Sequence, residues 1–163
     1  MASIIITASD IGRVTGYTRN QVRGLLDKLP GFAETETVPG VAREYSRTDL
    51  LVLAAIHHLE AKNRVQREAL GSVVTAVKTV LSGPKTINRD ARLIISFDPP
   101  AVTYLAAASA AVQEGIVIAL GPIFERVDDY LRKKFENPYT APGGPELNFG
   151  PMLVSRTRKK AAG

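Results

Sequence analysis

Five polar side chains able to contact nucleic acid stand together early in the chain: Thr18, Arg19, Asn20, Gln21 and Arg23. A guanidinium group matches O6 and N7 of guanine, and a carboxamide matches N6 and N7 of adenine, in each case through two hydrogen bonds. The free amides at the start of a helix also bind phosphate. The chemistry open to this cluster is therefore contact with base edges and with the DNA backbone.

A helix is needed to hold these side chains. Thr18 and Gln21 have the spacing of a capping box, so we expect the helix to begin directly after Thr18. Apolar residues then follow at the spacing of one buried helical stripe: Val22, Leu25, Leu26 and Leu29. A helix that buries this stripe leaves Arg19, Asn20 and Arg23 on its exposed face.

The neighbouring segments predict the surroundings of that helix. A short helix over about residues 8–14 ends at Gly16, a residue able to adopt a positive φ. Residues 32–45 alternate around a Pro-Gly pair, which predicts a small β-hairpin. A third helix starts at Ser46 and is apolar on nearly every side, and a fourth covers about 66–82. A winged helix-turn-helix has this order of elements: helix, tight turn, helix, hairpin and helix.

Beyond Pro84 the pattern changes toward strands. We expect strands at 92–97, 102–104 and 116–120, a short helix at 106–113, and a last helix over about 122–136. The last helix has a broad apolar face, which we interpret as a dimer interface together with strand 116–120. Its apolar residues are Ile123, Phe124, Val127, Tyr130, Leu131 and Phe135.

The predicted fold class is α+β, in three parts. Residues 1–83 form the winged helix-turn-helix domain, and residues 85–136 form a small α/β unit ending in an amphipathic helix. Residues 137–163 form a flexible, Pro/Gly-rich basic tail. The middle unit has few polar groups and no phosphate loop, so we favour dimerisation over binding of a small-molecule effector as its role.

Three motifs agree in order with a known family: Gly16-Tyr17-Thr18 with Val22-Arg23, then Val41-Ala42-Arg43-Glu44-Tyr45, then Asp49-Leu50 with Leu53 and Ile56. Through them, residues 5–81 resemble the DNA-binding region of the MerR family of transcriptional regulators. The resemblance implies that residues 18–21 start the recognition helix and that Arg23 helps to hold DNA. It also implies that Arg43 and Tyr45 belong to the wing, where they meet the phosphate backbone and pack the wing.

Other chemistries find little support. The chain has no cysteine, which excludes disulfides, thiolate metal sites and a cysteine nucleophile. His57 and His58 are adjacent and so cannot share a metal ion from one helix face, and Asp128 and Asp129 diverge by about 100° around their helix. We find no nucleophile–base pair and expect neither an enzyme nor a cofactor. Without a signal peptide or a membrane-length apolar segment, we expect a cytoplasmic protein.

Double-stranded DNA is the expected partner, read by a homodimer on an inverted repeat. The formal net charge is +5, yet residues 1–50 hold six basic and six acidic side chains, so DNA contact must depend on where the arginines are placed. That balance keeps two alternatives open. One is a protein-interaction module on a winged-helix scaffold. The other is an architectural factor of a phage or plasmid, of the excisionase or partition type.

Overall fold

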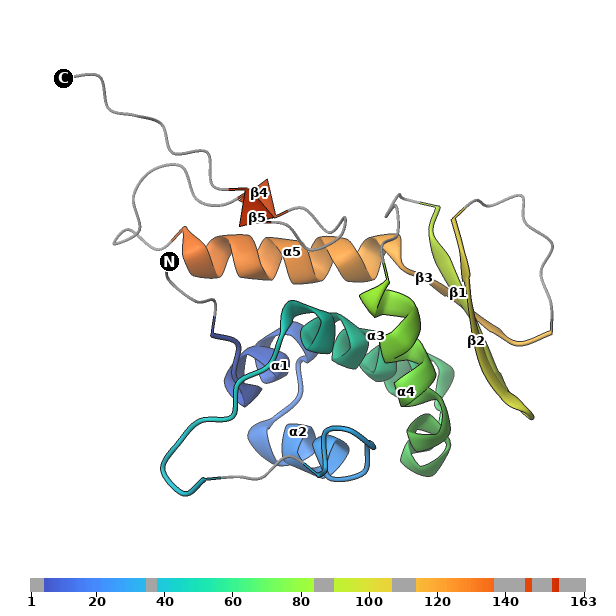
Figure 1. The fold of residues 1–163 in the computed structure, drawn as a ribbon, viewed down its shortest axis with the longest axis horizontal. Helices are drawn as coiled ribbons and strands as arrows, with labels where there is room; N and C mark the ends of the chain where they lie inside the picture. Colours follow the sequence, from blue (N-terminus) through green and yellow to red (C-terminus); the bar gives the residue numbers. More distant parts are fainter. Residues whose placement is uncertain are drawn as a thin grey trace, which may run out of the picture.

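A computed structural model describes residues 5–34, 38–83, 90–106 and 114–136, together with the backbone of 146–147 and 154–155. Across these residues the fold is α+β, with five helices and an antiparallel sheet of three strands. Figure 1 shows the helices gathered on one side of the molecule and the sheet at the other end.

The first two helices are joined by a tight turn. Helix α1 (Ala8–Thr15) ends at Gly16, which has a φ of 79°, and α2 (Arg19–Leu26) follows after two more residues. The predicted capping box of α2 is present: the Gln21 amide donates to the Thr18 hydroxyl oxygen at 3.3 Å, and the Thr18 amide donates to the Gln21 side-chain oxygen at 2.8 Å. The cap thus starts α2 where the sequence predicts it.

Helix α2 is shorter than its apolar stripe. It ends at Leu26, and Leu29 is buried from the turn that follows rather than from the helix. Backbone hydrogen bonds of 3.0 and 3.3 Å, each from an amide to the carbonyl three residues earlier, tighten this turn. The stripe is therefore buried as predicted, but in two kinds of local structure.

The predicted hairpin over residues 32–45 is wrong for the part of this segment that the structure describes. Residues 38–41 form a tight turn closed by a backbone hydrogen bond of 3.1 Å, but no strand flanks it there. The Tyr45 amide instead donates to the Ile6 carbonyl at 2.8 Å, in an isolated antiparallel bridge. The N-terminal segment thus supplies the backbone partner of Tyr45. Residues 35–37 lie outside the described residues.

Two long helices form the centre of the protein. Helix α3 (Arg47–Asn63) is capped by Ser46 and Asp49 as predicted and is buried over most of its length. Helix α4 (Arg67–Ser82) packs against it. The predicted stripe of α4 is buried: Leu70, Val73, Val74, Val77 and Leu81. These two helices agree closely with the sequence pattern.

The sheet has the order β2-β1-β3, with β1 (Arg92–Phe97) in the centre. Strands β2 (Pro100–Leu105) and β3 (Ile116–Ala119) pair with it antiparallel, and β1 and β2 contact α4. All three predicted strands are present, but β2 is longer than the expected 102–104, and β3 is one residue shorter than expected and buries only Ile118. Residues 107–113, most of an expected short helix, lie outside the described residues.

Helix α5 (Gly121–Phe135) lies along α3 and α1 (Figure 1). The core of its apolar face is at most 3% exposed: Ile123, Phe124, Val127 and Leu131. The prediction that this face forms a dimer interface is therefore wrong, because helices of the same chain already cover it.

One hydrophobic core extends through both predicted folding units. Its buried side chains run from Ile6 near the N-terminus to Leu131 in α5, so residues 1–83 and 85–136 share it. In the tail, β4 (Glu146–Leu147) pairs antiparallel with β5 (Val154–Ser155), and β4 contacts α5. No helix in the described parts of the chain has the length and apolar character needed to cross a membrane.

Candidate nucleic-acid interface

The predicted reading residues lie on the exposed face of α2. Arg19, Asn20 and Arg23 are exposed, and their side chains form no hydrogen bond or ion pair with the described residues. The opposite face of α2 is buried through Val22 and Leu25. Because the helix is anchored by one face and capped at its start, these three side chains project from a fixed platform.

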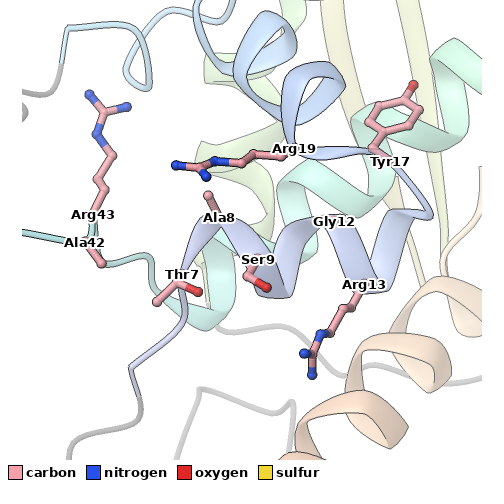
Figure 2. A pocket seen from close by; sticks show the side chains of 9 residues that line it. All are labelled: Thr7, Ala8, Ser9, Gly12, Arg13, Tyr17, Arg19, Ala42 and Arg43. Atoms are coloured by element: carbon pink, nitrogen blue, oxygen red, sulfur yellow. The ribbon is translucent and has the colours of Figure 1, made fainter.

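A groove with a volume of about 720 Å³ lies beside this platform. Its floor is formed by small residues of α1, namely Ala8, Ser9 and Gly12. Thr7, the residue before α1, also lines it. Arg19 from α2 and Arg43 from the segment 38–45 also line it. Figure 2 shows the Arg19 side chain extending along α1 above Ala8, on the side where Arg43 lies.

The electrostatic character of the groove suits an anion. Arg13, Arg19 and Arg43 line it together. The nearby carboxylate of Asp10 does not oppose them, because it is buried and already paired with Lys134 at 2.8 Å. Small floor residues allow a backbone to approach closely, and arginine binds phosphate through paired, charge-assisted hydrogen bonds. The groove can therefore hold part of a sugar–phosphate backbone.

Comparison of the chain with protein-family models, with curated proteins and with solved structures gave no match.

The two residues predicted for the wing, Arg43 and Tyr45, are placed differently. Arg43 is half-buried and its Nη1 donates to the Phe32 carbonyl at 2.7 Å, which orients the guanidinium at the edge of the groove. Tyr45 is only 8% exposed, and its ring lies 6.5 Å from that of Phe32, centroid to centroid. Tyr45 therefore packs against the core. Its ring surface is not available to a phosphate group in this conformation.

Tyr17 fixes the turn that precedes α2. Its hydroxyl donates to Glu60 Oε2 at 2.5 Å, and Arg67 Nε donates to the other oxygen of that carboxylate at 2.7 Å. Burial and the hydrogen bond to Glu60 raise the pKa of Tyr17 to about 12. A Cβ placed on Gly24 would lie 3.0 Å from Arg67 Nη1. The absence of a side chain at Gly24 thus leaves room for the Arg67 guanidinium.

His57, Asp128 and Asp129 each contact another side chain of the protein. The His57 ring meets Tyr17 edge to face at 4.6 Å between centroids, and burial followed by the charge of Arg126 lowers its pKa. Asp128 and Asp129 both pair with Arg132, at 2.8 and 3.6 Å. Their engagement with the same cation supports a structural role over a catalytic pair.

The sequence prediction missed Ser9 and Arg13. Both line the groove, and both lie on the side of α1 away from its buried residues Ile11 and Val14. They are four residues apart, so they share one helix face. A helical projection of α1 alone would have found them, whereas their position beside Arg19 depends on how α1 and α2 pack.

Proposed function

We propose that this protein binds double-stranded DNA in a sequence-specific manner, through a MerR-like winged helix-turn-helix in its N-terminal half. The observation that carries the proposal is the exposure of Arg19, Asn20 and Arg23 at the start of a capped helix, where they have no side-chain partner among the residues that the structure describes. In a helix-turn-helix, the first residues of the second helix meet base edges in the major groove. Arginine and asparagine are the residues that recognise guanine and adenine there.

The groove supplies the second part of the mechanism. With α2 in the major groove, the sugar–phosphate backbone passes the first helix of the pair. Arg13, Arg19 and Arg43, which line the groove together, then contact phosphates of that backbone. Phosphate contacts set register and orientation, and base contacts set sequence preference.

A homodimer acting as a transcriptional regulator completes the proposal. One short helix and a small wing bury less surface than specific DNA recognition normally requires, so two copies reading a two-fold symmetric site are expected. The dimer contact has to use a surface other than the apolar face of α5, which is buried within the protomer.

Selection from random duplexes tests the proposal. The wild-type chain should enrich a two-fold symmetric site, and its affinity for that site should fall steeply with salt. The double variant Arg19→Ala, Arg23→Ala should lose at least tenfold in affinity, since each paired contact with a base contributes about 1–3 kcal/mol. Arg92→Ala, in the distant sheet, is the control for the loss of a positive charge. Unchanged affinity in the double variant would refute the assignment of α2.

A protein-interaction module is the second candidate. The surface of the proposed wing segment, residues 38–45, favours it. Val38 and Val41 are 61% and 66% exposed at the tip of the turn. Glu34 and Glu44 are exposed on either side, so the segment is poorly suited to phosphate. Under this alternative, random duplexes yield no enriched site. The double change Val38→Ser, Val41→Ser would then abolish binding to the protein partner, whereas Arg19→Ala would leave that binding unchanged.

A further inference from the structure

Helix α5 carries two exposed cations that the proposed interface does not use. Arg126, Tyr130 and Lys133 have the spacing i, i+4, i+7, which places them in one row along the helix. Tyr130 faces α1, because its hydroxyl donates to Asp10. Arg126 and Lys133 are exposed, and their side chains form no hydrogen bond or ion pair with the described residues.

Two of the three acidic side chains of α5 are engaged by a cation outside this row, and the third, Glu125, is exposed next to Arg126. Asp128 and Asp129 are paired with Arg132, which lies outside the row. The charge of Arg126 acts on the neighbouring part of α3, where it contributes, after burial, to lowering the pKa of His57 and His58. Arg126 therefore places a positive charge beside α3.

Arg13 lies between the groove and the row formed by Arg126, Tyr130 and Lys133. It lines the groove together with Arg19, yet its side chain points away from Arg19 and toward α5 in Figure 2. Its charge also acts on the Tyr130 hydroxyl, where it opposes the larger effects of burial and Asp10 on the pKa of that group. Arg13 thus lies between the groove and α5.

The contact that brings α5 to this position is specific. Lys134 Nζ donates both to Asp10 Oδ2 at 2.8 Å and to the Ile5 carbonyl at 2.9 Å. Together with the Tyr130–Asp10 hydrogen bond, these contacts hold the last turns of α5 against the start of α1. Lys133 comes directly before Lys134, so its backbone is held at the edge of the proposed interface while its ammonium group stays exposed.

We infer that Arg126 and Lys133 form a second phosphate-binding surface, which engages duplex DNA flanking the site read by α2. Seven residues of helix separate the two cations by about 10 Å along the axis. Phosphates of one strand advance about 3.4 Å per nucleotide along the duplex, so the pair spans about three phosphates of one strand. The inference rests on the proposed DNA binding and extends it. The length of DNA that the protein covers is greater than that contacted by α1, α2 and the wing segment.

A duplex-length series tests this surface. The wild-type protein is titrated with its selected site in a short duplex, and with the same site extended on both flanks. The extended duplex should bind about tenfold more tightly at low salt, with a steeper salt dependence, since each added phosphate contact contributes about 0.9 to the slope per protomer. The variant Arg126→Gln, Lys133→Gln should bind the short duplex as the wild type does and lose the gain from the flanks.

The outcomes separate the two proposals. Arg92→Gln removes a charge in the sheet and should keep the full gain, and circular dichroism checks that each variant is folded. If the double variant keeps the gain, or if the wild type shows none, the flank surface is refuted while site recognition by α2 stands. If the wild-type protein binds neither duplex above background, the proposed function fails, and the flank surface fails with it.

Discussion

The Asp10 carboxylate in the first turn of α1 accepts a hydrogen bond from the Tyr130 hydroxyl in α5, 120 residues later in the chain. The same carboxylate accepts from the Thr7 amide at 2.7 Å and from Lys134 at 2.8 Å. One buried acidic group therefore caps α1 and attaches α5 to it. Through this contact, the helix that forms the groove floor is tied to the far end of the described chain.

Acid should release this contact. Burial opposes ionisation of Asp10, but the hydrogen bonds from Lys134, Tyr130 and Thr7 outweigh burial and lower its pKa from 3.8 to about 2. A carboxyl group whose pKa is lower in the folded state stabilises the fold above its ordinary pKa and ceases to do so as the pH falls. We expect the free energy of unfolding to fall by about 2 kcal/mol between pH 4 and pH 2 on account of Asp10.

Urea unfolding at several pH values measures this loss. Asp10→Asn should be less stable than the wild type at pH 7, and the difference between the two proteins should shrink as the pH approaches 2. If the free energies of unfolding of the two proteins differ by the same amount at every pH in that range, the ionised carboxylate of Asp10 does not stabilise the fold. Tyr130→Phe keeps the carboxylate and removes one donor, so it should lower neutral-pH stability by about 1–2 kcal/mol.

Alkaline titration should reveal the contact between Tyr17 and Glu60. Burial and the hydrogen bond to Glu60 raise the pKa of Tyr17 from 10.0 to about 12, so this contact stabilises the fold below pH 10 and is lost as the pH rises through 12. The absorbance of tyrosinate should therefore show a step near pH 12 that loses amplitude in Tyr17→Phe. Tyr130→Phe should also reduce this step, because burial and Asp10 raise the pKa of Tyr130 to about 12 as well. An unchanged step in Tyr17→Phe would contradict the assignment.

Gly12 should be intolerant of a side chain although it lies within a helix. A Cβ at this position would lie 2.9 Å from the Tyr17 carbonyl oxygen, a backbone atom that cannot turn aside. Gly12→Ala should therefore lower the free energy of unfolding by about 1–3 kcal/mol, despite the better helix propensity of alanine. Thermal unfolding provides the measurement.

Gly71→Ala in α4 is the matched control. The nearest atoms to a Cβ there are the Lys28 carbonyl oxygen at 3.4 Å and Pro30 Cδ at 3.6 Å, which are ordinary contacts. This variant should be neutral, or more stable by about 0.5–1 kcal/mol. Equal effects at the two glycines would show that α1 does not approach the Tyr17 turn closely.

Arg47 should be replaceable by an apolar side chain. It is 8% exposed, and its three guanidinium nitrogens are buried without a hydrogen bond to any other described residue. Burial lowers its pKa, and the charge of Asp128 only partly offsets that effect. Replacing a buried charge by an apolar group of similar volume is often stabilising, so Arg47→Met should raise the free energy of unfolding by about 1 kcal/mol. Chemical denaturation at pH 7 checks this value.

A shorter side chain separates charge from volume at this position. Arg47→Ala should destabilise by about 2 kcal/mol, because it leaves a cavity at the start of α3. If Arg47→Met lowers the free energy of unfolding as much as Arg47→Ala does, the Arg47 guanidinium stabilises the fold. The attraction to Asp128 would then outweigh the cost of burying the charge.

Local patterns in the sequence determined the elements that position the candidate site. The capping pairs Thr18–Gln21 and Ser46–Asp49 were predictable because both partners lie within one helical turn, whatever the rest of the chain does. The stripe of α4 and the strand at 92–97 were predictable for a similar reason, since a buried face imposes its period on the residues that form it.

Tertiary structure decided which surfaces meet. The alternation of apolar and polar residues over 32–45 could not show that Tyr45 would pair with Ile6. Backbone amides and carbonyls form hydrogen bonds with any extended segment that lies beside them, whatever its sequence. The apolar face of α5 was evident in the sequence, but whether it covers α3 or a second copy depends on packing between distant segments. Exposure of Arg19, Asn20 and Arg23 follows from one helix by itself. The grouping of Arg13 and Arg43 with Arg19 arises only when distant segments pack together. The position of α5, which carries Arg126 and Lys133, against α1 likewise depends on long-range burial and the Asp10 contact.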